Sequence, residues 1–221
     1  MKRLIVICEG ETEQGFCNTV LSPYFMSKGI FVEAPLIKHS NGGIVRWEIL
    51  KKQIETTLIK ETTAYVTLLI DYYGLYQKYG FPGWSDAEQI VDKNDRMKYL
   101  EAQMSADIND RIRYRFIPYL QLHEFEGILF CNVEVFKQII PTNELIGLEE
   151  LEQVIADYPN PEMINTCKET SPSHRLQRII HGYNKIVYGN ILAECIGLPV
   201  IRQKCPRFNE WLNILECLPT L

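Results

Sequence analysis

The chain of 221 residues lacks a long hydrophobic run. No apolar stretch reaches the roughly 18 residues that a membrane-spanning helix requires. The apolar stretch Leu4–Cys8 is followed at once by an acidic cluster, whereas a signal peptide needs an uncharged apolar region of at least about seven residues. With 46% hydrophobic and 23% charged residues, the composition is that of an ordinary globular protein. We therefore expect a cytoplasmic protein with no membrane partner.

Several sequence signatures of known site types are also missing. The seven cysteines are odd in number and form no CxxC pair, which argues against a zinc cluster and against a disulfide framework. No GxxxxGK[ST] motif occurs, so we expect no ATPase activity from this chain alone. The net charge of −5 argues against nucleic-acid binding over the whole surface, although it allows a local basic patch.

Apolar runs and amphipathic segments alternate along the first half of the chain. The pattern predicts helices over residues 12–24, 44–59 and 85–109, and strands over residues 3–8, 30–37, 64–70 and 115–122. This order predicts an α/β fold with a mainly parallel sheet flanked by helices. From Val133 onward the pattern is mainly helical. We therefore predict an α/β core over residues 1–140 and a helical C-terminal extension over residues 141–221 packed on it.

Carboxylates follow three of the predicted strands. The carboxyl ends of parallel strands meet at one edge of a sheet, which is the edge where ligands bind. Carboxylates gathered there would repel one another unless a cation joined them, and Mg²⁺ (or Mn²⁺) prefers such oxygen ligands. The sequence therefore predicts a divalent-metal site, suited to phosphoryl chemistry, with ligands among Glu9, Glu13, Asp71, Glu124 and Glu126.

A structural explanation of the same acids stays open. Glu11 and Glu13 lie in the first turn of a predicted helix, where acids stabilise the helix dipole without any catalytic role. Polar residues at strand ends also mark the point where the chain meets water. His123 is similarly open to a role as a ligand or proton carrier, or as a hydrogen-bonded structural histidine.

Basic residues gather near the C-terminus. Residues 168–207 hold seven Lys and Arg but only two acids. Ser171 and Pro172 are typical of a helix start, and Arg175 and Arg178 follow one turn apart. A helix N-terminus beside arginines suits a phosphate group, whereas a solvated basic face is the alternative. The tyrosines at 72, 73 and 76 similarly suit either base stacking or packing against the core.

Six motifs in order along the chain resemble a bacterial family of Toprim-like proteins related to the OLD-family nucleases. They are Glu9-Gly10-x-Thr12-Glu13, Asp71-Tyr72-Tyr73-Gly74, His123-Glu124-Phe125-Glu126, Pro172-Ser173-His174-Arg175, Tyr183-Asn184-Lys185 and Cys205-Pro206-Arg207-Phe208. Members of that family are commonly encoded beside ATPases of the AAA or ABC type in mobile-element and phage-defence loci. The resemblance therefore implies a partner ATPase.

The resemblance also implies a Toprim fold with Mg²⁺ at the carboxyl edge of the sheet, and metal-dependent cleavage or joining of nucleic-acid phosphodiesters. Glu9 corresponds to the glutamate that acts as a ligand or general acid/base, and Asp71 to the first aspartate of the DxD motif. Tyr73 stands where the second aspartate would be. Glu124 or Glu126 would then supply the missing carboxylate.

The leading hypothesis is a Mg²⁺-dependent nuclease, for which DNA ranks above RNA as the substrate while both stay open. Its catalytic residues would be Glu9, Asp71, Glu124 and Glu126, with Arg175 and Lys185 orienting the phosphate backbone. One alternative is a non-catalytic sensor or adaptor subunit of an ATPase complex with a degenerate metal site. A phosphoacceptor receiver or DxD phosphatase fits less well, because the first cluster is Glu and the second Asp is missing. The sequence leaves self-association open.

Overall fold

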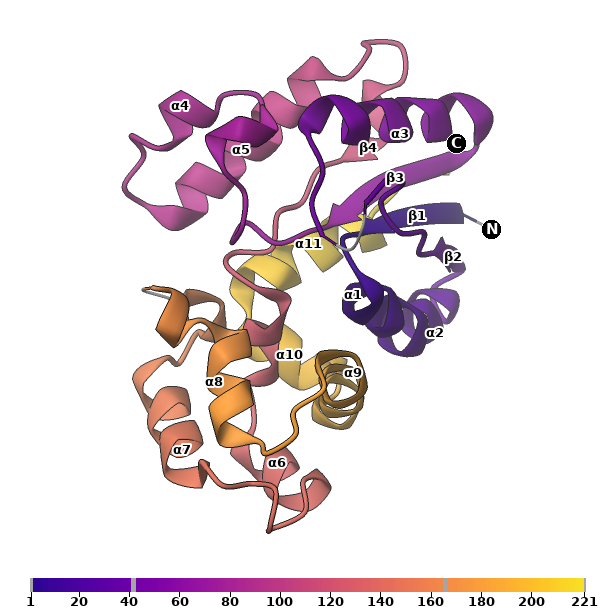
Figure 1. Ribbon diagram of the computed structural model, residues 1–221. Coiled ribbons are helices and arrows are strands. Elements are labelled where there is room, and N and C mark those ends of the chain that lie inside the picture. The colour runs from indigo at the N-terminus through magenta and orange to yellow at the C-terminus, as the bar shows by residue number, and fades with distance from the viewer. Residues whose placement is uncertain (1, 41–42, 165–166, 221) are drawn as a thin grey trace. The chain divides into compact units, whose positions relative to one another are not determined.

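The computed structural model describes residues 2–40, 43–164 and 167–220 (Figure 1). The chain forms two compact units, one made of residues 1–122 with 216–221 and the other of residues 123–215. The boundary predicted from the sequence lies later, between residues 140 and 141. Within the described ranges, no helix combines the length and the apolar character needed to cross a membrane.

A four-stranded sheet lies at the centre of the first unit. Its order is β2 (Ile30–Glu33), β1 (Lys2–Cys8), β3 (Ala64–Leu69) and β4 (Phe116–Ile117), and every neighbouring pair is parallel. Every side chain of β3 is buried, which explains why this strand is a continuous apolar run. The predicted α/β fold with a parallel sheet flanked by helices is confirmed.

The two edge strands are shorter than predicted. Pro35 and Pro118 lie just beyond β2 and β4, and proline has no N–H to give to a strand ladder. Parallel pairing resumes past each proline, where Leu36 forms a bridge with Cys8 and Gln121 forms one with Asp71. Each predicted edge strand is therefore interrupted by its proline and pairs again at the carboxyl edge of the sheet.

Helices lie on both sides of this sheet. Figure 1 shows α1 (Glu11–Phe16) and α2 (Ser22–Met26) on one side and α3 (Trp47–Lys60) on the other. A π-helical turn over Cys17–Leu21 joins α1 to α2. The third predicted helix is broken into α4 (Trp84–Ala87) and α5 (Lys93–Asp107). The break is stabilised by Asp92, whose side chain accepts a hydrogen bond from the backbone N–H of Asp95 at 2.9 Å.

Arg115 closes the C-terminal end of α3. Its side chain is buried, and its guanidinium donates hydrogen bonds to the carbonyl oxygens of Leu58 at 2.7 Å, Glu61 at 2.8 Å and Ala64 at 2.9 Å. The last carbonyls of a helix have no partner within the helix, so a cationic donor there satisfies them and also opposes the helix dipole. Arg115 thereby fastens the end of α3 to the start of β3.

The second unit is built from short helices, as the sequence predicts for this half of the chain. They are α6 (Val133–Ile139), α7 (Leu148–Asp157), α8 (Pro172–Ile179), α9 (Lys185–Ile196), α10 (Leu198–Lys204) and α11 (Pro206–Glu216). Proline opens α8 and α11 because the first helical position needs no N–H donor. Phe125, Phe136 and Phe208 are buried in the core of this unit.

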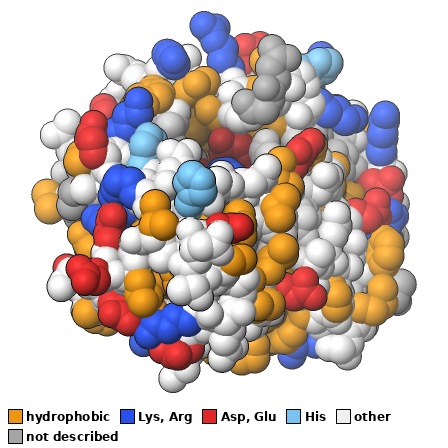
Figure 2. Space-filling view, turned by 60° about the horizontal axis from the view of Figure 1, so that its bottom comes forward, with side chains coloured by type: hydrophobic (Ala, Val, Ile, Leu, Met, Phe, Trp, Pro, Cys, Tyr) orange, Lys and Arg blue, Asp and Glu red, His pale blue; other side chains and the backbone are white. Residues whose placement is uncertain are grey.

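The charged side chains are mixed in sign on the face drawn in Figure 2. There Lys and Arg lie among Asp and Glu, with apolar side chains between them. This mixture agrees with the sequence, in which 28 acids only slightly outnumber 23 bases.

Candidate functional site

Glu9 and Asp71 meet at the carboxyl edge of the sheet. Glu9 continues the ladder beyond β1, with its backbone N–H donating to the carbonyl of Leu69 at 3.1 Å. Its side-chain Oε2 accepts a hydrogen bond from the backbone N–H of Asp71 at 3.0 Å. The structure therefore brings together two acids that lie 62 residues apart in the sequence, as the positions of the strand ends predict.

The backbone around Asp71 is fixed by the neighbouring chain. The backbone N–H of Gln121 donates to the carbonyl of Ile70 at 2.8 Å, and the backbone carbonyl of Gln121 accepts the N–H of Tyr72 at 2.8 Å. Asp71 itself is only 7% exposed. Because these hydrogen bonds hold the backbone on both sides of Asp71, its side chain extends from a fixed backbone position at the sheet edge. A metal or substrate site requires such fixed positions.

Glu13 has a structural role at the start of α1. Its Oε2 accepts a hydrogen bond from the backbone N–H of Gly10 at 2.9 Å, and Gly10 is the N-cap residue of this helix. A Cβ on Gly10 would lie 3.1 Å from that same Oε2. The glycine therefore makes room for the glutamate, and this contact explains two residues of the first motif without a metal.

The pair of Glu9 and Asp71 suits a magnesium ion chemically. In the part of the chain that the structure describes, no group of three or more His, Cys, Asp or Glu is arranged to hold a metal ion. Mg²⁺, however, is usually bound by only one or two carboxylates, with waters and substrate phosphates completing its six ligands. Glu9 and Asp71, two acids joined by a backbone-to-carboxylate hydrogen bond at a ligand-binding edge, fit that pattern.

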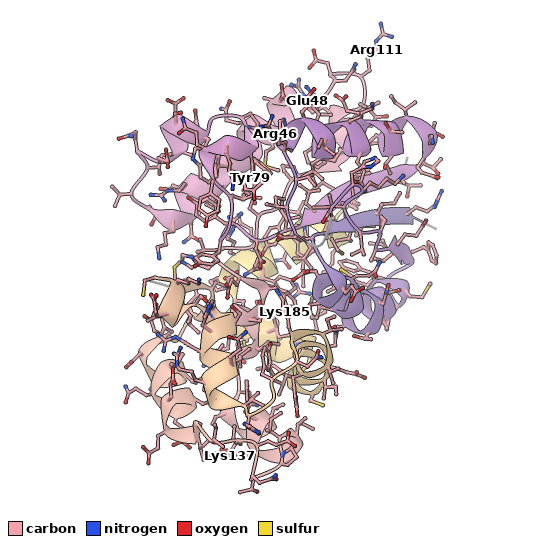
Figure 3. All side chains as sticks on the ribbon, viewed as in Figure 1. Arg46, Glu48, Tyr79, Arg111, Lys137 and Lys185 are labelled. Atoms are coloured by element: carbon pink, nitrogen blue, oxygen red, sulfur yellow. The ribbon has the colours of Figure 1, made fainter. Side chains whose placement is uncertain are left out.

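The tyrosines that follow Asp71 divide into two groups. Tyr72 packs within the unit: its ring is stacked on Trp84 with centroids 5.8 Å apart, and its hydroxyl accepts a hydrogen bond from Arg96. Tyr76 is 56% exposed and stacks on Tyr79, which is labelled in Figure 3. Packing therefore accounts for Tyr72, whereas Tyr76 is exposed, Tyr79 is half-buried, and the Nζ of Lys78 lies over both of their rings.

Glu124 belongs to the second unit and caps α8 there. Its Oε2 accepts the backbone N–H of Ser173 at 2.8 Å, and its Oε1 accepts the Ser173 hydroxyl at 3.1 Å. Ser171 is the N-cap and Pro172 the first helical residue, as predicted. An anion does lie at this helix N-terminus, but it is a carboxylate of the same chain.

Glu126 is fully buried in the second unit. Its Oε1 lies 2.9 Å from the Nζ of Lys185, the first residue of α9 (Figure 3). Burial and the neighbouring Glu126 raise the pKa of the Tyr183 hydroxyl well above its ordinary value. Burial removes the water that would solvate a tyrosinate, and the negative charge of Glu126 repels it. Glu126 and Lys185 thus form an ion pair inside this unit, and their roles in metal and phosphate binding stay predictions.

Arg175 and Arg178 share one acidic partner. Arg178 lies 2.6 Å from Glu150 of α7, and Arg175 lies 3.5 Å from the same carboxylate while its Nε donates to the carbonyl of Thr170. The Arg175 side chain is only 13% exposed. These arginines therefore join α7 to α8, and their geometry fits a structural explanation at least as well as a phosphate site.

Glu162 is a buried acid that the sequence does not single out. It is 1% exposed, and its two carboxylate oxygens accept the backbone N–H groups of Arg207 at 2.9 Å and Phe208 at 3.0 Å, at the start of α11. Burial raises its pKa to about 7, although the two N–H donors oppose that rise. Its partners lie 45 and 46 residues away in the sequence, so no local sequence pattern predicts this contact.

We expect the stability of the second unit to depend on Glu162 ionisation. The pKa is about 7 in the folded chain, above the ordinary 4.5, so stability should fall as the pH rises between these values. The difference amounts to about 3 kcal/mol. Urea unfolding of the protein and of its Glu162→Gln variant, followed at several pH values, measures it. The variant should lack this part of the pH dependence, and parallel profiles for the two proteins would contradict the expectation.

Fold and site together define the class of this protein: a parallel α/β protein in which two acidic residues, Glu9 and Asp71, come together at the carboxyl edge of the sheet. The chain belongs to the family described as Domain of unknown function (DUF4276), whose model matches residues 8–216. Searches of curated proteins and of solved structures found no match.

Proposed function

We propose that this protein is a Mg²⁺-dependent phosphodiesterase of the nuclease type, with Glu9 and Asp71 as its metal-binding carboxylates. The observation that supports this is the hydrogen bond from the Asp71 backbone to the Glu9 carboxylate, which keeps the two acids together at the edge of a parallel sheet. A Mg²⁺ ion bound there supplies Lewis-acid stabilisation of phosphate charge. The two side chains hold and orient that ion.

The substrate class and the partner follow from the resemblance of the motifs. Toprim-like proteins act on nucleic-acid phosphodiesters, and DNA is the preferred substrate in this proposal. The same resemblance favours a partner ATPase of the AAA or ABC type in a phage-defence or mobile-element system. Glu124, Glu126, Arg175 and Lys185 remain proposed contributors to the reaction.

A nuclease assay on the purified chain tests this proposal. Single-stranded DNA, duplex DNA and RNA are incubated with Mg²⁺, with Mn²⁺ and with a chelator, in the presence and absence of the proposed partner ATPase. Cleavage that requires the metal and prefers DNA is the expected result. Absence of metal-dependent cleavage on every substrate, with and without the ATPase, would contradict it.

A second function is favoured by Tyr73, which stands where a second metal-binding aspartate is expected. In this case the chain is a sensor or adaptor subunit of the ATPase complex and does not cleave nucleic acid. Calorimetric titration with Mg²⁺ separates the two functions. Tight association with the ATPase, together with absent or only millimolar Mg²⁺ binding, would favour the adaptor.

A further inference from the structure

A basic groove lies in the first unit beside α3. It is a hollow of about 470 Å³ whose lining includes Lys38, Lys52, Lys60, His39 and Glu48. An adjoining hollow of about 480 Å³ shares Lys38 and Lys60 with it and reaches Ile5 and Glu33 of the sheet. The two hollows form a continuous groove along the helix, which we call the α3 groove.

The floor of the α3 groove is held by Gln53. This buried side chain donates to the carbonyl of Leu36 at 3.1 Å and accepts the backbone N–H of Lys38 at 2.8 Å. It thereby fastens the segment after β2 to α3. Because both walls of the groove are tied together by these bonds, the groove is part of the folded structure and its lysines project from fixed backbone positions.

The lysines of the α3 groove are available to a ligand. Considering the described residues alone, the Nζ atoms of Lys38, Lys52 and Lys60 have no ion-pair or hydrogen-bond partner. The two acids at the far end of the groove, Glu33 and Glu61, both pair with Arg3, at 2.6 and 2.5 Å, so its single positive charge balances one of their two negative charges. Three lysines and Arg3 stand against Glu48, Glu33 and Glu61, which leaves the groove a net charge of +1 inside a chain whose total charge is −5.

The spacing of the lysines favours a chain of phosphates over a single ion. Lys52 and Lys60 lie eight residues apart on one face of α3, which corresponds to about 12 Å along the helix axis. Glu48 and Arg46 lie at the beginning of the same helix (Figure 3). Three cations distributed along an elongated groove match a ligand that repeats its negative charge at intervals.

Lys38, which lines the α3 groove, follows a segment that pairs with the end of β1. Leu36 bridges to Cys8, and the backbone N–H of Ile37 donates to the carbonyl of Cys8 at 3.0 Å. Lys38 therefore follows directly from the segment that lies beside Cys8 and Glu9. A strand lying in the groove would have one end near Glu9 and Asp71.

We propose that the α3 groove binds the sugar–phosphate backbone of a single-stranded nucleic acid and leads it toward Glu9 and Asp71; this inference rests on the proposed function for its substrate class. Lys38, Lys52 and Lys60 contact phosphates spaced along the strand. Glu48 opposes binding, since its carboxylate lies in the same lining.

Fluorescence anisotropy with a labelled oligothymidylate of about twelve nucleotides tests the groove in chelator, so that no cleavage occurs. Lys52→Ala and Lys60→Ala should each weaken binding about fivefold and make the slope of log affinity against log salt shallower by about 0.7. Lys51→Ala is the matched control: it removes the same charge from the neighbouring residue of α3, which is paired with Asp107. It should change affinity less than about twofold.

Glu48→Gln provides a test that loss of folding cannot imitate. Removing this negative charge should strengthen binding by about twofold or more. Inorganic phosphate should compete only weakly, and a duplex of the same length should bind less tightly. The inference is overturned if the wild-type chain does not bind the oligonucleotide, if Lys51→Ala weakens binding as much as Lys52→Ala, or if inorganic phosphate competes as well as the oligonucleotide.

Failure of the groove is separable from failure of the proposed function. A chain that binds the oligonucleotide through Lys52 and Lys60 but never cleaves it would refute the catalytic proposal and support the groove. A chain that cleaves with Mg²⁺ while Lys52→Ala binds normally would refute the groove alone.

Discussion

Replacing Glu9 by Gln or Asp71 by Asn should reduce Mg²⁺-dependent cleavage about a thousandfold or more. Each change removes the negative charge of one of the two acids at the sheet edge while keeping the side chain's size. In the Glu9→Gln variant the new amide oxygen can still accept the Asp71 backbone N–H, so the fold should be kept. Initial rates of oligonucleotide cleavage at saturating Mg²⁺ measure the effect.

The control for this experiment is Glu11→Gln. Glu11 belongs to the same acidic cluster but is exposed in the first turn of α1. Its replacement should leave cleavage within about twofold of the wild-type rate, because an exposed helix-dipole charge acts on stability only weakly. Full activity in both the Glu9 and the Asp71 variants would show that the metal is held elsewhere.

Replacing Arg115 by Met should lower the free energy of unfolding of the first unit by about 3–5 kcal/mol. The methionine fills most of the buried space but leaves the carbonyls of Leu58, Glu61 and Ala64 without their donor. Arg115→Lys keeps the charge, yet a single ammonium cannot reproduce the planar fork of donors, so an intermediate loss is expected. Denaturant unfolding followed by circular dichroism measures these differences.

Arg113 offers a matched comparison for that result. It lies two residues away in the same 3₁₀ turn, but its side chain is partly exposed and pairs with Asp110. Arg113→Met should cost less than about 1 kcal/mol, as is usual for a surface ion pair. If Arg115→Met costs no more than this, the closing of α3 by the guanidinium contributes little to stability.

The sheet could be predicted because its central strands carry a strong local signal. β1 and β3 are short apolar runs that end in an acid, and burial of both faces makes such runs easy to identify. The lengths of the outer strands could not be predicted as well. Pro35 and Pro118 interrupt the ladders, and pairing beyond them depends on neighbouring strands rather than on the local sequence.

The acidic site was predictable only in part. Glu9 and Asp71 follow from the rule that parallel strands share an edge. Glu124 and Glu126 follow the predicted fourth strand equally closely, but their contacts are made with Ser173 and Lys185 within the second unit. The partners of these two acids lie far along the chain, at a helix start and in a buried ion pair. Such contacts produce no periodicity near Glu124, so the local sequence does not predict them.

The contact between Glu124 and α8 affects the binding of dissolved anions at the start of that helix. A phosphate arriving at the start of α8 must displace a carboxylate that is tethered to the same chain and already receives two hydrogen bonds. A tethered group competes at an effective concentration far above that of most dissolved ions. A dissolved phosphate can therefore bind at the N-terminus of α8 only in competition with the Glu124 side chain.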